Sequence, residues 1–299
     1  MNGFLVVDKP PGISSHTVVS RIRRITGQKK AGHTGTLDPF ATGVLPIALG
    51  DATKAIQFLD ESMKEYRAVM RIGQITDTQD CTGTLLEEHA WQQVTDDDIL
   101  RAAALFLGPQ KQLPPMYSAI KQNGVPLYRL ARQGSDVPRE LRDITIHSIR
   151  VEQISLPEIT LLVSCSRGTY VRTLAHDIGR HLGCGAHLVS LRRTRSGPFS
   201  IDTALALEQV ALNVEANEPG SWLMSVPSAL GEMHELQLSD SGARKVLNGV
   251  IPAIGEFLPT CLPVDCERVM LMHGERLLAV ARCFLSEGTS TLRLLRVFT

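Results

Sequence analysis

One carboxylate stands in a segment whose residue types favour a rigid loop. Residues 32–43 read GHTGTLDPFATG, with Asp38 directly before Pro39. The three glycines permit positive φ or close approach of another backbone, while Pro39 biases Asp38 towards an extended conformation. The segment lies between an amphipathic helix and a buried strand expected at residues 44–49, where a scaffold can present a functional side chain. An isolated Asp-Pro more often only starts a turn. The position of this loop instead favours a carboxylate that is held in one direction for a function.

Two further segments carry side chains that could act with such a loop. Residues 64–73 alternate as a strand, and Tyr66 falls on its apolar face, where a tyrosine is more often a core residue. Residues 167–175, RGTYVRTLA, predict a glycine exit from a strand into a helix, with Tyr170 and Arg172 in its first turn. An arginine there opposes the helix dipole. A carboxylate partner would explain its presence.

The other elements are predicted by apolar periodicity and by capping signals. Ser14 or Ser15 caps the first helix and Gly27 ends it, Thr95 with Asp98 resembles a capping box, and Asn123-Gly124 is a hairpin signal. Strands are expected at residues 4–7, 44–49, 64–73, 144–155 and 158–166, with a later strand up to 195, and helices at 15–26, 51–59, 95–107, 127–134 and 204–212, with one more from about 170.

Composition bounds the class of protein. The 299 residues are 43% hydrophobic and 21% charged, which is typical of a globular chain long enough for one large domain and a small one. No run of about 20 apolar residues predicts a membrane span, and the N-terminal residues do not read as a signal peptide, so a cytoplasmic location is expected. Six cysteines without a CxxC pair favour reduced thiols, and no metal site is expected.

Charge distribution is more informative than net charge. The net charge is zero, which argues mildly against nucleic-acid binding. However, basic residues gather at 21–30, 129–142 and 192–195, whereas acidic residues gather at 87–98. Each basic run alone is more often a solvated surface. Their combination with the loop at Asp38 favours an RNA-binding face.

The loop and its continuation GDATK at residues 50–54 resemble the signature of the TruB family of tRNA pseudouridine synthases, relatives of the archaeal and eukaryotic Cbf5/dyskerin enzymes. The similarity extends to KPxG followed by two serines at residues 9–15, to KxY at 64–66 and to PPxYSAxK at 114–121. It continues through GTYxRT at residues 168–173. This resemblance implies an α+β pseudouridine synthase fold, with a mixed, largely antiparallel sheet flanked by helices.

The resemblance also implies a role for each matched side chain. Asp38 matches the catalytic nucleophile, and Arg172 matches the arginine that pairs with it. Tyr66 corresponds to the tyrosine that stacks on the target uracil, and Leu191 to the leucine that packs against it. The remaining matches are Tyr170, which would contact the flipped nucleotide, His33, which would occupy the space that the base vacates, and Lys9, a candidate for the wall of the site.

The domain division is partly read from composition and partly implied by the family. Residues 1–230 would form the catalytic domain, with an RNA-binding insertion at about 108–143. Residues 231–299, rich in short strands, would form a small β-rich, PUA-like RNA-binding domain. A small β domain with a purely structural role is the alternative.

The chemistry implied by the family is the isomerisation of uridine 55 in the T-loop of tRNA. It adds no group and involves no net redox change, so no cofactor is expected, and a carboxylate can serve as the nucleophile at C6 or C1′. We expect tRNA as the partner through its T-stem-loop, with a monomer that needs no protein partner. The alternatives are a non-catalytic tRNA-binding protein and a guide-dependent synthase. A phosphoryl-transfer enzyme is disfavoured because no GxxxxGK[ST] loop is present.

Overall fold

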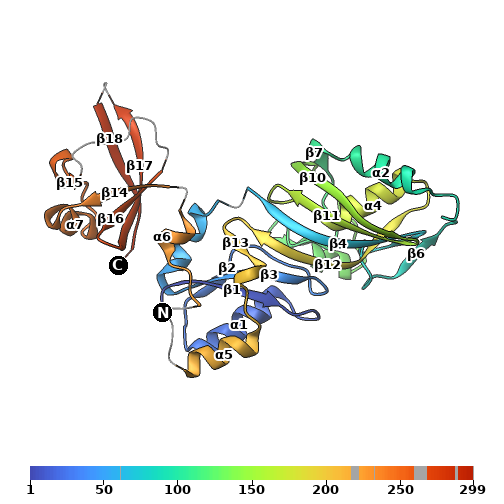
Figure 1. The fold of residues 1–299 in the computed structure, drawn as a ribbon, viewed down its shortest axis with the longest axis horizontal. Coiled ribbons are helices and arrows are strands. Elements are labelled where there is room, and N and C mark those ends of the chain that lie inside the picture. The colour runs from blue at the N-terminus through green and yellow to red at the C-terminus, as the bar shows by residue number, and fades with distance from the viewer. Residues whose placement is uncertain (61, 217–221, 232, 259–267, 287–288, 299) are drawn as a thin grey trace.

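The computed structural model describes residues 1–60, 62–216, 222–231, 233–258, 268–286 and 289–298 (Figure 1). Nine strands of this described chain form one sheet, in the order β1-β3-β12-β4-β11-β10-β7, with β2 paired to β3 and β13 to β12. All pairs are antiparallel except β12 with β3, so the expected mixed, largely antiparallel sheet is confirmed. These strands are β1 (Gly3–Lys9), β2 (Ala31–His33), β3 (Thr42–Leu49), β4 (Lys64–Ile72), β7 (Gly108–Gln112), β10 (Arg142–Ser155), β11 (Glu158–Cys165), β12 (Ala186–Ser196) and β13 (Phe199–Ser200).

Helices cover the face of the sheet that bears the apolar side chains. On β4, Tyr66, Ala68 and Met70 are buried and alternate with more exposed residues, as the period of two predicts. They share one core cluster with Leu174 and Ile178 of α4. The helices of this domain are α1 (Ser15–Thr26), α2 (Asp96–Ala104), α3 (Leu127–Arg132), α4 (Val171–His181) and α5 (Leu207–Glu215).

Helix α1 confirms the predicted caps. The Ser14 side chain accepts a hydrogen bond from the backbone N–H of Thr17, and Gly27 ends the helix with φ 66°. The hairpin at Asn123-Gly124 is also present, between β8 (Lys121–Gln122) and β9 (Val125–Pro126). A second small hairpin pairs β5 (Gln74–Thr76) with β6 (Leu85–Glu88).

Two local expectations differ from the structure. Residues 51–59 form two 3₁₀ turns, η1 (Gly50–Lys54) and η2 (Ile56–Phe58), rather than one helix. Residues 108–112, expected to be irregular after the end of a helix, form the edge strand β7, whose partner is β10. An edge strand tolerates Pro109 because one side of its backbone needs no partner.

The C-terminal part is a second sheet, of order β15-β14-β16-β17-β18. The sequence reading missed a helix here, α7 (Asp240–Leu247), whose start is capped by Ser239. Its eight residues are too few for a clear periodic signal. The elements of this part are α6 (Val226–Ala229), β14 (His234–Leu238), α7, the 3₁₀ turn η4 (Ile254–Glu256), β15 (Phe257–Leu258), β16 (Val269–His273), β17 (Arg276–Ser286) and β18 (Thr289–Val297). A short 3₁₀ turn, η3 (Ile201–Thr203), follows β13 in the larger domain.

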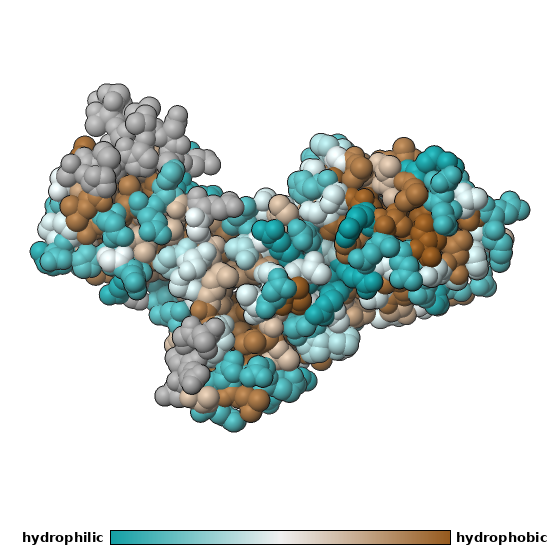
Figure 2. Space-filling view, in the orientation of Figure 1, coloured by the Kyte–Doolittle hydropathy of each residue, from teal (hydrophilic) through white to brown (hydrophobic). Residues whose placement is uncertain are grey.

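The two sheets are joined by a shared apolar core. Met270, Met272 and Val280 of the C-terminal sheet belong to one buried cluster with Phe4 and Phe58 of the larger domain. In Figure 2 the upper outline of the molecule dips between the C-terminal part at the left and the larger sheet at the right. The C-terminal sheet is therefore packed onto the rest of the chain rather than only tethered to it. No helix of the described residues is long and apolar enough to cross a membrane.

Candidate active site

A cavity of about 360 Å³ opens where the loop after β2 meets the sheet and the start of α4. Loop residues 33–38 form one side of it. The start of β4, the later part of β12 and residues 167–172 form the others, and residues 118 and 119 of the insertion complete the lining. Five separate segments of the sequence therefore build one site.

The Asp38 loop is held by the elements on both sides of it. The Ser15 hydroxyl at the start of α1 donates to Leu37 O (3.0 Å) and accepts from Leu37 N–H (2.8 Å). Gly12 N–H donates to Pro39 O (2.8 Å). These bonds fix the backbone on both sides of Asp38, so that the direction of its carboxylate is set before any ligand arrives.

Lys9 holds the Asp38 loop and the segment before α1 through their backbone oxygens. Its ammonium is fully buried and donates to the backbone oxygens of Pro10, Ile13 and Pro39 at 2.8–3.1 Å. It is not among the residues that line the cavity, in contrast to its expected place in the wall. Burial lowers the pKa of Lys9 to about 8, against the opposing attraction of Asp38.

Arg172 is the direct partner of Asp38. Its Nε lies 2.8 Å from Asp38 Oδ2 and its Nη2 lies 3.2 Å from Oδ1, which makes a two-bond fork. The same guanidinium donates to Thr78 O and Tyr117 O, both at 2.8 Å, and its side chain is 2% exposed. Asp38 is thus the carboxylate partner that was expected for an arginine in the first turn of this helix.

Asp80 is a second carboxylate beside this arginine, and the sequence reading missed it. Its Oδ2 lies 3.6 Å from Arg172 Nη1, and its other oxygen accepts bonds from Thr78 and Thr82. Burial raises the pKa of Asp38, and the nearby charge of Asp80 raises it further, whereas the guanidinium of Arg172 lowers it. The sequence feature that could have indicated Asp80 is the TDTxD pattern at residues 76–80. Its two threonines are buried in the structure.

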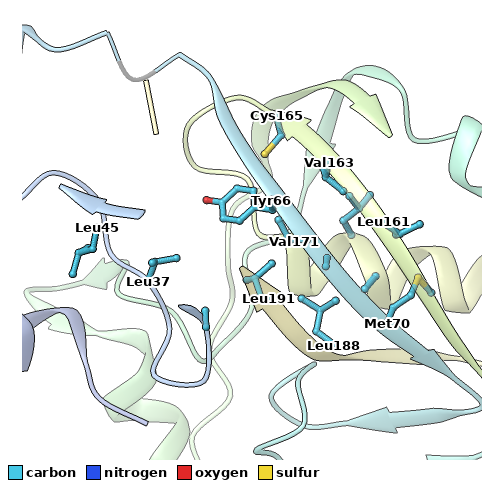
Figure 3. Close-up of a cluster of buried hydrophobic side chains, with 14 of the residues drawn as sticks. Leu37, Leu45, Tyr66, Met70, Leu161, Val163, Cys165, Val171, Leu188 and Leu191 are labelled. Carbon is cyan, nitrogen blue, oxygen red and sulfur yellow. The ribbon is translucent and has the colours of Figure 1, made fainter. Parts of the chain in front are cut away.

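Tyr66 and Leu191 form an apolar wall of the cavity and are both buried. Figure 3 shows that the Tyr66 ring lies at the end of the core cluster and that its hydroxyl points away from Met70 and Leu161. Burial raises the pKa of Tyr66, partly offset by Arg193. A ring and a leucine in this arrangement can hold a flat, uncharged group.

The two remaining expected residues also line the cavity. His33 belongs to the loop side, and Tyr170 stands at the start of α4. The backbone of Tyr170 is fixed by the Gln112 side chain, which accepts from its N–H (2.8 Å) and donates to its oxygen (3.0 Å). The edge strand β7 therefore helps to place the start of α4.

Lys64 and Arg193 line the same cavity. The sequence analysis counted Arg193 only in a basic run and placed neither residue in the site. Both were detectable, because Lys64 is two positions before Tyr66 on β4 and Arg193 is two positions after Leu191 on β12, so that each shares the face of its neighbour. Among the described residues, no group of three or more His, Cys, Asp or Glu side chains could hold a metal ion.

Comparison with solved structures defines the class of fold. The structure of a Cbf5-Nop10-Gar1 complex contains a chain with a TM-score of 0.73 and 30% identity, covering 99% of this chain and 84% of that one. The structure of an H/ACA RNP bound to a substrate RNA containing 2′-deoxyuridine gives a TM-score of 0.74 and 27% identity, with 99% and 85% covered. The chain thus has the fold of a pseudouridine synthase.

Sequence comparison defines the family. The model of the TruB family pseudouridylate synthase N-terminal domain matches residues 23–171, and that of the tRNA pseudouridylate synthase B C-terminal domain matches residues 172–226. Proteins named tRNA pseudouridine synthase B are 54% identical in Geotalea uraniireducens and 49% identical in Geobacter sulfurreducens. Each match covers all of this chain and at least 98% of the relative. The chain belongs to the TruB family of pseudouridine synthases, which are isomerases.

Proposed function

We propose that this protein isomerises the uridine at position 55, in the T-loop of tRNA, with Asp38 as the nucleophile. The observation that carries the proposal is the forked Asp38–Arg172 pair in a cavity walled by Tyr66 and Leu191. The reaction breaks the N1–C1′ bond, rotates the uracil and joins C5 to C1′. The proton lost from C5 is balanced by one gained at N1, so the chain needs no cofactor.

Asp38 meets the requirements of a nucleophile in this reaction. Arg172 fixes both of its oxygens and favours the ionised form, while the carboxylate remains about one-third exposed towards the cavity. The arrangement is compatible with attack at C6 or at C1′ of the nucleotide. Tyr66 and Leu191 would hold the severed uracil between them during its rotation, and enclosure by the cavity would keep it from water.

The substrate assignment follows from the relatives and from the shape of the site. The relatives are named for tRNA, and a uridine must leave its stack to enter a cavity, at a cost of a few kcal/mol that is lower in loops. His33, which lines the cavity, would occupy the space that such a base vacates. Tyr117 and Ser118 connect the insertion to the cavity, so a stem-loop bound by the insertion would deliver its base to Asp38.

Several broader assignments belong to the same proposal. Residues 1–230 form the catalytic domain, with the insertion at about 108–143, and residues 231–299 form a PUA-like domain that binds RNA. The protein acts in the cytoplasm as a monomer without an obligatory protein partner. The matched solved chains occur in complexes such as Cbf5-Nop10-Gar1, so independence from partners needs a direct test.

Tritium release from a tRNA transcript labelled at uridine C5 is that test. Purified wild type, with no partner or cofactor added, should release tritium, and a transcript with cytidine at position 55 should release none from that site. Asp38→Asn should release none, while its tRNA affinity stays within about tenfold of wild type because only the nucleophile changes. Appreciable turnover by Asp38→Asn would refute the assignment, and tight binding without turnover by wild type would indicate a binding role or missing partners.

A further inference from the structure

Two buried cations line the cavity beside Tyr66. Arg193 lies opposite Tyr66 in the β12–β4 ladder, and Lys64 lies opposite Ser196. Both side chains are more than nine-tenths buried, yet both border the cavity. Neither takes part in the Asp38–Arg172 fork, and the Lys64 ammonium donates to Ser196 Oγ (2.7 Å).

Arg193 is held by uncharged groups. Its Nε donates to Val44 O (2.8 Å) and its Nη2 donates to Gly35 O (3.1 Å). In the described part of the chain, no carboxylate lies within 4.0 Å of its guanidinium. Burial of a charge costs free energy unless an opposite charge compensates it. An anion entering the cavity would supply that compensation.

Gly35 leaves a space that both cations face. A methyl group added at Gly35 would lie 3.6 Å from Arg193 Nη1 and 3.7 Å from Lys64 Nζ. Gly35 is not in the left-handed region, so its backbone conformation does not require glycine. The absence of a side chain keeps open a place where one small anionic group could reach both cations.

We propose that Lys64 and Arg193 form a phosphate subsite, which binds the phosphodiester next to the uridine held against Tyr66. The subsite rests on the proposed function, since an RNA nucleotide supplies both the flat base and the adjacent anion. The Nη1 atom of Arg193 and the ammonium of Lys64 both face this space, and a guanidinium and an ammonium can together bind two phosphate oxygens. Base and phosphate would thus be fixed at two points of one cavity, which sets the ribose relative to Asp38.

The subsite is tested by affinity measurements in which a charge is removed from the RNA, from the protein or from both. Unmodified T-stem-loop RNA would be compared with RNA that carries a neutral methylphosphonate on the 5′ or the 3′ side of the target uridine. At the contacted linkage, wild type should lose roughly 10- to 100-fold in affinity, the range expected for a hydrogen bond to a charged group. Lys64→Met, which keeps the length of the side chain, should lose no more than about threefold from the same modification, because it already lacks one of the two cations.

Gly35→Ala provides a second variant that keeps both cations. Its methyl would make only ordinary contacts, so the unfolding temperature should match wild type, but the methyl would fill the space for the anion and weaken binding by about tenfold or more. A methylphosphonate placed two linkages away is the matched control and should affect all proteins equally. Wild-type affinity in Gly35→Ala, or equal losses for wild type and Lys64→Met at both linkages, would overturn the subsite.

These outcomes are separable from failure of the proposed function. Absence of pseudouridine after incubation of wild type with unmodified RNA would refute the activity, whatever the affinities show. Coupling between Lys64 and one linkage would still establish the phosphate subsite in that case. An active wild type without such coupling would retain the activity and remove the subsite.

Discussion

For Arg172→Lys, the hydrogen bonds of the site allow both the loss of stability and the loss of turnover to be worked out. The guanidinium makes four hydrogen bonds, two to Asp38 and one each to Thr78 O and Tyr117 O. A single ammonium cannot reproduce the fork, and we expect it to lose one bond to Asp38 and one to a backbone oxygen. Hydrogen bonds to charged groups contribute about 1.5–3 kcal/mol each. The free energy of unfolding should therefore fall by about 3–6 kcal/mol.

The share of that loss that falls on Asp38 predicts the effect on turnover. One lost bond to Asp38, the proposed nucleophile, contributes about 1.5–3 kcal/mol, which corresponds to a rate reduction of about 10- to 150-fold. Single-turnover formation of pseudouridine at saturating tRNA measures this rate, and urea unfolding measures stability in the same preparation. Arg180→Lys is the matched control, because Arg180 is exposed on the same helix, and it should change neither quantity.

Two results would refute this reasoning. A folded Arg172→Lys variant with a wild-type single-turnover rate would show that the fork does not position Asp38. A variant with wild-type stability but a large loss of tRNA affinity would show that Arg172 acts on the RNA rather than on the carboxylate.

Three further predictions address the groups around this pair. Asp80→Asn removes a charge that raises the pKa of Asp38. Because the proposed attack needs the ionised carboxylate, the acid limb of the pH–rate profile should move to lower pH. An unchanged acid limb would contradict the influence of Asp80 on Asp38. Ser15→Ala leaves the N–H and oxygen of Leu37 without their buried partner and should lower the free energy of unfolding by about 2–4 kcal/mol, whereas the exposed control Ser20→Ala should stay within about 0.5 kcal/mol in the same urea titration. Met270→Ala should lower the free energy of unfolding by about 2–5 kcal/mol. The whole chain should still unfold in a single transition, because Met270 packs in the core that the two sheets share. Two separate transitions would mean that the two parts unfold independently.

The parts of the fold that were predictable depend on local signals. The alternation in β4, the caps of α1 and the Asn123-Gly124 hairpin each lie within a few residues, and the structure confirms them. The edge strand β7 was missed because its pairing with β10 is a contact between distant segments, and nothing in GPQKQ indicates a strand on its own. Helix α7 and the 3₁₀ turns are too short for periodicity to separate them from loops.

The same distinction applies to the site. The place of Arg172 in a helix start indicated a carboxylate partner, and the family motif indicated which one. The contacts from Arg172 to Thr78 and from Arg193 to Val44 span 94 and 149 positions, and no spacing rule connects such residues. The fold shows that Asp80 lies beside Arg172 and that Lys64 and Arg193 line the cavity.

The arrangement around Arg172 reconciles two opposing demands on the proposed nucleophile, Asp38. Exclusion of water from a severed base would require an enclosed site, and enclosure disfavours the charged form of Asp38 that the proposed attack needs. One arginine bound to Asp38 alone would restore the charge but would also neutralise it in a tight pair. Here Arg172 divides its donors among Asp38, two backbone oxygens and the nearby Asp80. Arg172 therefore holds Asp38 in place and lowers its pKa, whereas burial and the charge of Asp80 raise it.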